Sequence, residues 1–215
     1  MRKLISLITL LALTIGMTVN ADCQDSLLQA YINNNMQVWE NYLTNTRFDS
    51  LTTSEKLKYL NYEYGYVAVC IDREKDEAKT FLSRFEKHIN GLDTVLTHAD
   101  LLAYKSAFYA YDLKIHKSHL ARSARRTLRF ADEALEADSL STMALTMNAN
   151  LLFYRPRWLG GNKKRAYLHL VKARQQFENK GDTCCWNYYH CLQMITLSEQ
   201  KYKIKLCEQN KNLTE

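Results

Sequence analysis

Residues 153–177 read FYRPRWLGGNKKRAYLHLVKARQQF and hold the single proline of the chain together with two of its six glycines. Pro156 cannot continue a helix, because its ring removes a backbone donor and clashes with the preceding turn. The Gly160–Gly161 pair permits a sharp reversal of the backbone. Asn162 is a good N-cap for a helix that follows it. We therefore expect this stretch to be a turn between two helices.

A phosphate-binding glycine loop is the alternative for the same stretch. Such a loop follows a strand and has a different glycine spacing, whereas no strand is predicted before Pro156. The stretch therefore favours the turn. The apolar side chains of Trp158 and Leu159 are expected to pack against the two helices, as a hydrophobic staple does.

The same helical spacing of apolar residues extends over the rest of the chain, and alternating spacing is absent. The fold class that this pattern predicts is all-α. The predicted helices cover 25–46, 53–72, 75–90, 97–115, 118–137, 140–155, 162–179 and 184–206.

Three of the predicted helices share one apolar spacing, with members at positions i, i+4, i+7 and i+11. The three series begin at Ala78, Ala124 and Ala166, where a small residue lets a neighbouring helix come close. Another helix precedes each of them, so the chain repeats a two-helix unit every forty-odd residues. One hairpin cannot cover its own apolar face, and hairpins of this kind stack. An ordinary helical bundle is the alternative.

The pattern Ala-x-x-x-Leu-x-x-Ala in the second helix of a hairpin resembles the tetratricopeptide (TPR) repeat. ADEALEADSLSTMALTMNANLLFY (131–154) resembles the junction between two such repeats, with Ser139 at the place of the usual proline. RPRWLGGNKKRA is similar to a turn of exported bacterial TPR-like proteins, including the T component associated with TRAP-type solute transporters. The resemblance is clearest over 53–179. It implies a right-handed solenoid of antiparallel helix hairpins, with extra helices at both ends.

The N-terminus, MRKLISLITLLALTIGMTVNADC, has the form of a secretory signal: two basic residues, an apolar run and short residues before Ala21. We expect cleavage after Ala21, which leaves 22–215 as one exported domain, periplasmic or secreted, without a membrane span. A retained anchor is the alternative, but a span needs about 20 apolar residues. The formal net charge of +6 falls to +4 without Arg2 and Lys3, which is too small to indicate a nucleic-acid partner.

All six cysteines follow the predicted signal, and export favours disulfides over free thiols. Cys184 and Cys191 lie about 10 Å apart along one predicted helix, which is too far for a bond between them. Cys23 begins the first predicted helix and Cys70 lies near the end of the second. An antiparallel hairpin brings these two positions together, so Cys23–Cys70 is the disulfide that we expect.

Metal sites and catalytic groups are not indicated by the sequence. His116 and His119 supply two imidazoles, whereas a metal site needs three or four ligands. The cysteines and the histidine of 184–191 lack the C-x-x-C spacing of a zinc site. No nucleophile–base pair or carboxylate pair has the spacing of a known motif, so we expect no enzyme activity, metal or cofactor.

Two groups of residues are candidates for binding a partner. The arginines at 122, 125, 126 and 129 are three and four residues apart and share one helix face, which suits an acidic partner, although a solvated face is the common alternative. Tyrosine is frequent at recognition surfaces, and two tyrosines seven residues apart suit a concave groove. The candidate residues are Tyr104, Tyr111, Arg122, Arg125, Arg126, Arg129, Arg155 and Trp158.

The function that these features favour is a non-enzymatic binding scaffold of the cell envelope. It would engage a protein or peptide partner through the concave surface of the repeat. The first alternative is a carrier of a small or hydrophobic ligand that works with a membrane transporter, which a closed tunnel through the stack would favour. The second is a Cys/His metal-dependent enzyme.

Overall fold

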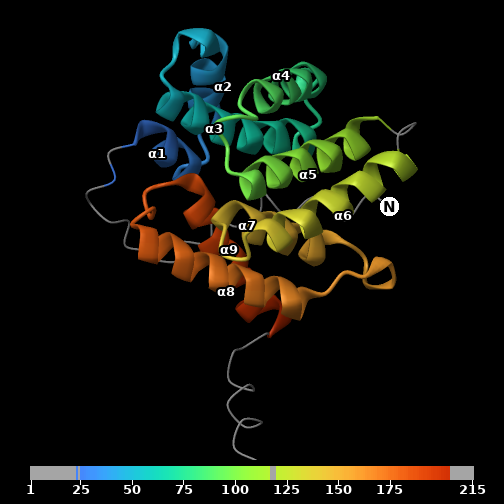
Figure 1. The fold of residues 1–215 in the computed structure, drawn as a ribbon. Helices are drawn as coiled ribbons and strands as arrows, with labels where there is room; N and C mark the ends of the chain where they lie inside the picture. Colours follow the sequence, from blue (N-terminus) through green and yellow to red (C-terminus); the bar gives the residue numbers. More distant parts are fainter. Residues whose placement is uncertain (1–22, 24, 117–119, 204–215) are drawn as a thin grey trace, which may run out of the picture.

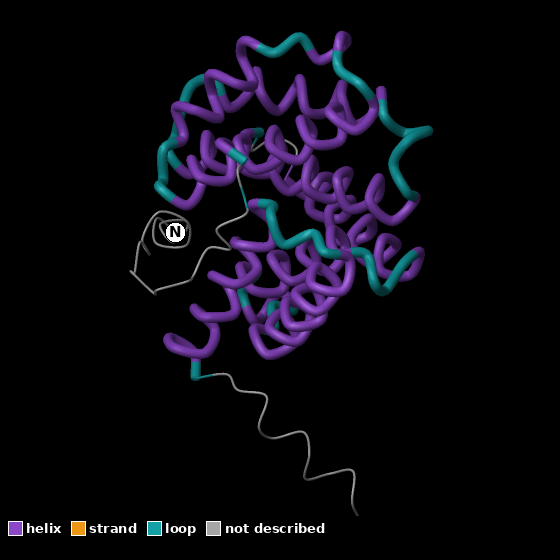
Figure 2. The backbone as a smooth tube through the Cα atoms, turned by 90° about the vertical axis from the view of Figure 1, so that its left-hand side faces the viewer, coloured by secondary structure: helices purple, strands orange, loops and turns teal. Residues whose placement is uncertain are grey.

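The computed structural model describes residue 23, residues 25–116 and residues 120–203 (Figure 1). Figure 2 shows helices joined by short loops, and no strand occurs within these ranges. The all-α prediction is therefore confirmed. The helices are α1 (Ser26–Ile32), α2 (Met36–Asn45), α3 (Thr53–Asp72), α4 (Ala78–Gly91), α5 (His98–Ile115), α6 (Leu120–Ala137), α7 (Thr142–Tyr154), α8 (Lys163–Lys180) and α9 (Trp186–Tyr202), with short 3₁₀ helices η1 (Phe48–Ser50) and η3 (Arg157–Leu159).

The described part of the chain contains no helix with the length and apolar character of a membrane span. The predicted signal over 1–21 lies outside the described residues.

The predicted helix over 25–46 is interrupted, so its prediction as one helix is wrong. Between α1 and α2 the backbone of Asn34 has a φ of 54°. Asparagine tolerates this left-handed conformation better than most residues, and three asparagines in a row occupy 33–35. The break lets α1 run in a different direction from α2.

Helix starts follow the local sequence. Thr97 accepts a hydrogen bond from the backbone N–H of Asp100, and Asn162 accepts one from that of Arg165, at 3.1 and 3.0 Å. The Asn162 cap agrees with the prediction. α3 begins at Thr53, as predicted, and Thr52 and Glu55 form a capping box at its start.

The turn between α7 and α8 is confirmed, but its two apolar side chains do not pack as a staple. Gly160 has a φ of 88°, and a Cβ on Gly161 would lie 1.8 Å from the carbonyl oxygen of Arg155, so both positions need glycine. The side chains of Trp158 and Leu159 are 82% and 52% exposed. The prediction that they pack against the helices is wrong, because η3 directs them to solvent.

Consecutive helices pack in pairs: α3 with α4, α5 with α6, and α7 with α8. The first helices of successive pairs also touch, since α5 contacts both α3 and α7. The three pairs begin where the repeated unit of the sequence predicts them.

The predicted equivalence of the three spacer alanines holds only in part. Ala78 and Ala166 are buried, whereas Ala124 is partly exposed. In α6 the buried residues are instead Ser123, Thr127, Ala131 and Ala134. Polar contacts set this rotation, because the Ser123 hydroxyl donates to Asp112 and the Ser106 hydroxyl donates to the Thr127 carbonyl oxygen. The equivalence of Ala124 is therefore wrong.

The two ends of the described chain meet. α1 contacts α9, and Cys23 forms a disulfide with Cys184, 161 residues away in sequence. The predicted Cys23–Cys70 pairing is wrong, since Cys70 is a free, fully buried thiol in α3. Asp25, two residues after Cys23, bonds to Tyr62 and Lys58 of α3, each at 2.9 Å. Cys23 therefore lies beside the first half of α3 and the start of α9, away from Cys70 near the end of α3.

Trp186, at the start of α9, holds this helix against α2 and α3. The ring of Trp186 lies 5.7 Å, centroid to centroid, from that of Trp39 in α2. Its Nε1–H donates to the carbonyl oxygen of Asn61 in α3 at 3.2 Å. Both rings approach α3 at Gly65, where a Cβ would meet Trp39 at 2.8 Å and Trp186 at 2.9 Å. The absence of a side chain at residue 65 is therefore what lets α2 and α9 converge on α3.

We expect Gly65→Ala to lower the free energy of unfolding by about 1–3 kcal/mol, because the added methyl group overpacks a site that two rigid rings already fill. Urea denaturation followed by circular dichroism measures this loss. Gly91→Ala is the matched control: no atom lies within 4 Å of the added Cβ, so stability should be unchanged or slightly higher. Equal effects of the two changes would contradict the packing described for residue 65.

Replacing both Cys23 and Cys184 by serine should lower the free energy of unfolding by about 2–5 kcal/mol, since the bond closes a long loop. Urea denaturation of oxidised wild type and variant measures the difference. Cys185→Ser keeps the bond and should retain wild-type stability. Peptide mapping that joins Cys23 to a cysteine other than Cys184 would refute the pairing.

Candidate binding site

Side chains from five helices meet around Tyr31 and Tyr64. They come from α1, α3, α5, α7 and α9, so every second helix contributes. We call this group the central cluster; its members are Tyr31, Tyr64, Tyr111, Asn150, Tyr154 and His190.

Polar contacts join α1, α7 and α9 within the central cluster. The Tyr31 hydroxyl donates to Oε1 of Gln193 at 2.8 Å and lies 3.4 Å from Nδ1 of His190. The other ring nitrogen of His190 lies 3.4 Å from Oδ1 of Asn150. These groups tie the first and last described helices to the middle of the chain.

Aromatic rings supply the other side of the cluster. Tyr64 of α3 and Tyr111 of α5 are stacked with centroids 5.8 Å apart, and the Tyr111 hydroxyl donates to the backbone carbonyl oxygen of Tyr64 at 3.2 Å. Trp186 lies 5.5 Å from Tyr64. The Tyr154 hydroxyl contacts the sulfur of Met194 at 3.5 Å. The cluster therefore combines flat apolar faces with a few polar groups.

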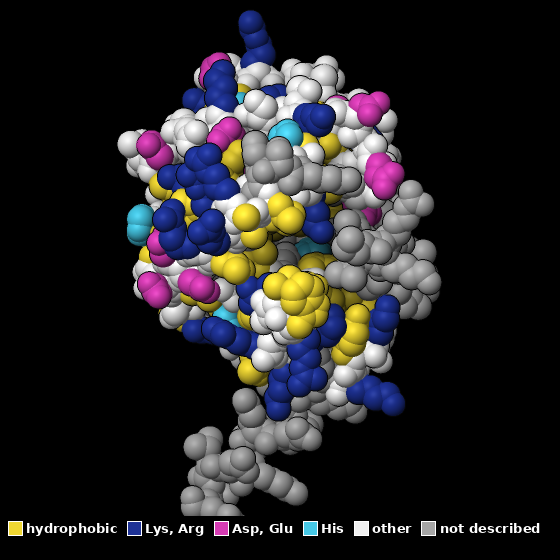
Figure 3. Space-filling view, turned by 90° about the vertical axis from the view of Figure 1, so that its right-hand side faces the viewer, with side chains coloured by type: hydrophobic (Ala, Val, Ile, Leu, Met, Phe, Trp, Pro, Cys, Tyr) yellow, Lys and Arg dark blue, Asp and Glu magenta, His cyan; other side chains and the backbone are white. Residues whose placement is uncertain are grey.

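Of the six members only Tyr64 is buried. The other five side chains are partly exposed, although each contacts a neighbouring helix. A close-packed core leaves no such surface. These five residues therefore keep partial contact with solvent. Figure 3 shows one face of the molecule, where hydrophobic side chains gather around a hollow that Lys and Arg side chains border.

The cluster carries no charge of its own at neutral pH. Burial lowers the pKa of His190 from 6.5 to about 4, so its imidazole is neutral. Burial also raises the pKa of Tyr154 to about 12 and that of Tyr31 well above its usual range. The groups can exchange hydrogen bonds with a ligand, but no activated nucleophile is present among them.

The two candidate tyrosines lie close together around Tyr64. Tyr111 belongs to the central cluster. Tyr104 is buried, its ring lies 6.0 Å from that of Tyr64, and its hydroxyl accepts a hydrogen bond from Nδ2 of Asn61 at 3.2 Å. Tyr104 therefore packs against the buried Tyr64 and lies beneath the cluster, away from solvent.

The candidate arginines of α6 lie apart from this cluster. Arg122, Arg125 and Arg129 are exposed, and Arg129 lies 3.5 Å from Glu133. Arg126 is partly buried: its guanidinium covers the ring of Tyr109 and donates to the Tyr109 hydroxyl at 2.8 Å.

The other two candidates belong to the α7–α8 turn. The guanidinium of Arg155 donates to the carbonyl oxygen of Gly160 at 2.9 Å, which makes it a brace of the turn. Trp158 is exposed.

The cysteines and the histidine of 184–191 have different structural roles. Cys184 is in the disulfide, Cys191 is buried with its thiol against the carbonyl oxygen of Leu170, and His190 belongs to the central cluster. Within the described ranges no three histidine, cysteine, aspartate or glutamate side chains are grouped as metal ligands. His119 and Cys207 lie outside those ranges.

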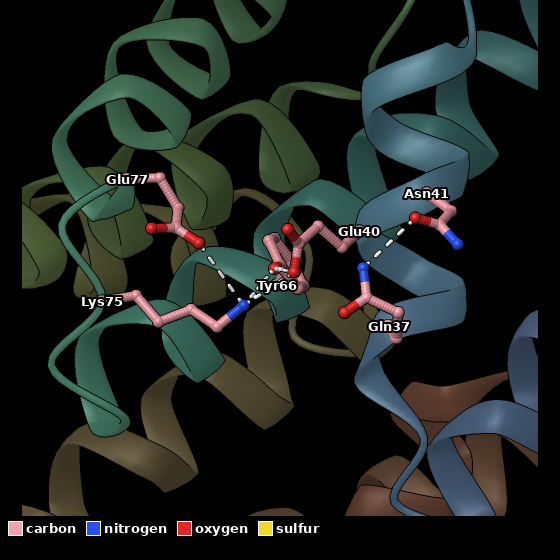
Figure 4. Close-up of polar contacts among 6 residues, drawn as sticks. All are labelled: Gln37, Glu40, Asn41, Tyr66, Lys75 and Glu77. Atoms are coloured by element: carbon pink, nitrogen blue, oxygen red, sulfur yellow. Dashed lines mark hydrogen bonds and ion pairs between the residues drawn. The ribbon is translucent and has the colours of Figure 1, made fainter.

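A second group of ionisable side chains joins α2, α3 and the α3–α4 turn (Figure 4). The Tyr66 hydroxyl donates to Oε2 of Glu40 at 2.6 Å, and the Lys75 ammonium donates to the same oxygen at 2.7 Å. Lys75 also lies 3.4 Å from Glu77. The hydrogen bond from Lys75 is the main cause of a lowered pKa of Glu40, whereas burial raises that of Tyr66. These groups satisfy one another and brace the helices.

Sequence reasoning missed five of the six members of the central cluster: Tyr31, Tyr64, Asn150, Tyr154 and His190. Each is a single aromatic or polar side chain on a helix whose inner face could not be assigned. Tyr31 and His190 become neighbours only because α9 returns to α1. The spacing of apolar residues within each helix does not indicate that α9 packs against α1.

Comparison of the chain with protein-family models, with curated proteins and with solved structures finds no match. The TPR resemblance therefore stays a prediction.

Lowering the pH from 6.5 to 4 should destabilise the protein through His190. The unfolded chain binds a proton in this range that the folded protein, with its lowered pKa, does not bind. The difference corresponds to at most about 3 kcal/mol, less what partial exposure of the ring removes. Urea denaturation across this pH range should show a smaller loss in His190→Gln than in wild type. His98→Gln, at an exposed position on α5, should behave as wild type, and identical pH dependence in all three proteins would contradict the prediction.

Proposed function

We propose that this protein is a non-enzymatic binding protein of the cell envelope. Its central cluster takes a small, uncharged organic molecule that has a flat apolar face and hydrogen-bonding groups. The observation that carries this proposal is the convergence of five helices on aromatic and neutral polar side chains that keep contact with solvent. Ligand pockets have this composition, apolar walls with a few placed polar groups.

The closure of the chain favours a small ligand over a long peptide in an open groove. α1 and α9 touch on the inner side and are linked by the Cys23–Cys184 bond. An extended segment that crosses the inner face would have to separate them. Of the functions expected from the sequence, the carrier of a small ligand therefore has the better support.

The finer fold assignment is also a proposal: a right-handed, TPR-like solenoid in which alternate helices line the inner side. The contacts of α5 with α3 and α7 support it, while the position of Ala124 departs from the repeat. Export to the cell envelope is supported by the disulfide.

A protein partner on the face of α6 is the second candidate function. The exposure of Arg122, Arg125 and Arg129 favours it. An acidic surface would suit these side chains, and such a contact would leave the central cluster free.

A matched pair of probes tests the ligand site. We expect p-nitrophenyl β-glucoside, which is flat at one end and neutral, to bind to the full chain in equilibrium dialysis. p-Nitrophenyl phosphate shares the ring but carries charge, and it should bind much more weakly, because the uncharged cluster offers its charge no partner. Tyr31→Phe removes a hydroxyl of the cluster and should weaken binding of the glucoside by about threefold to tenfold.

The control is Tyr188→Phe, which removes the hydroxyl that donates to Glu178 outside the cluster. It should bind the glucoside as wild type does. Equal weakening by the two changes, or tighter binding of the phosphate, would refute the proposed site.

A further inference from the structure

The α7–α8 turn carries the most exposed large hydrophobic side chain of the described residues. Trp158 is 82% exposed and its neighbour Leu159 is 52% exposed. The other two tryptophans, Trp39 and Trp186, are buried at 1% and 6%. Leaving an indole in water forfeits a large apolar contact, so this position is a candidate for interaction with something outside the chain.

Several hydrogen bonds fix the backbone of the turn, so the exposure of Trp158 does not come from a poorly held loop. The Gly161 N–H donates to the carbonyl oxygen of Pro156 at 3.0 Å, and the Asn162 N–H donates to that of Leu152 at 2.9 Å. The guanidinium of Arg155 closes the turn on Gly160. The backbone thus holds Trp158 outward at the tip of the hairpin.

The charge around this tip has a single sign. Between Asp138 and Glu178 the sequence contains no carboxylate and seven basic residues: Arg155, Arg157, Lys163, Lys164, Arg165, Lys172 and Arg174. Arg157 and Arg165 are exposed beside the turn. Of these seven, Arg174 lies 3.7 Å from Glu178 at the far end of α8. On α6, acidic residues follow the arginines directly and Arg129 pairs with Glu133.

An exposed tryptophan among cations suits an anionic lipid surface better than a folded partner. The side chains of Trp158 and Leu159 offer a much smaller surface area than the roughly 800 Å² that each partner buries in a stable protein interface. Tryptophan is enriched where membrane meets water, and basic side chains are attracted to anionic headgroups. We propose that the α7–α8 turn docks on an anionic lipid surface, with Trp158 and Leu159 among the headgroups and Arg157 and Arg165 on the lipid phosphates. This docking is independent of the central cluster.

Vesicle binding tests the proposal directly. The full chain should sediment with vesicles of phosphatidylcholine and phosphatidylglycerol in equal parts, and much less with phosphatidylcholine alone. Brominated lipids should quench the tryptophan fluorescence of the bound protein, because the indole of Trp158 is exposed and would contact the lipid. Trp158→Ser should lower the partition coefficient by about tenfold, because the largest apolar group at the surface is lost. Arg157→Ser with Arg165→Ser should lower it by roughly fivefold to twentyfold.

Matched variants separate the turn from general properties of the surface. Leu140→Ser changes another exposed hydrophobic residue, and Lys79→Ser with Lys87→Ser removes two exposed cations from α4. Both should bind vesicles nearly as wild type does. Equal binding to neutral and anionic vesicles, or equal loss in test and control variants, would overturn the proposal. A shift of Trp158 emission by polyglutamate, without vesicle binding, would assign the turn to an acidic protein and overturn it as well.

Discussion

The fold depends on two tryptophan rings that meet over a residue without a side chain. Trp39 of α2 and Trp186 of α9 both approach α3 at Gly65. This contact returns the last described helix to the beginning of the chain. The disulfide between Cys23 and Cys184 holds the same junction covalently. Without this closure, α1 and α9 would be the free ends of an open row of helices.

The closure also determines the chemistry of the inner side. Tyr31 and His190 belong to opposite ends of the sequence and meet only because α9 lies against α1. Enclosing the imidazole lowers its pKa, which keeps the central cluster uncharged. Basic side chains are instead found outside, on α6 and around the α7–α8 turn. The central cluster is thus neutral whereas these outer faces are basic, and the two proposed activities use different parts of the molecule.

Features set by neighbouring residues could be predicted from the sequence. The helical period predicts the fold class and seven of the eight helical segments, and the Asn162 cap and the Gly160–Gly161 turn follow from local hydrogen bonding and backbone freedom. Long-range features could not be predicted in this way. The rotation of α6 depends on Ser123 meeting Asp112 of another helix, and the pairing of Cys23 depends on α1 lying against α9, far away in sequence. At Trp158 an apolar residue in a turn suggested burial, yet the braced 3₁₀ turn exposes it.

The junction of the two chain ends bears on how the protein is made. Synthesis supplies Cys23 early and Trp186 late, with 161 residues separating the two bonded sulfurs in sequence. The helix pairs α3–α4, α5–α6 and α7–α8 rest on local contacts and can form as they emerge. The inner site, by contrast, does not exist until the final described helix has arrived. A nascent chain that stalls before residue 186 would therefore hold folded hairpins with an unpaired thiol and an uncovered aromatic face, which makes it prone to aggregation.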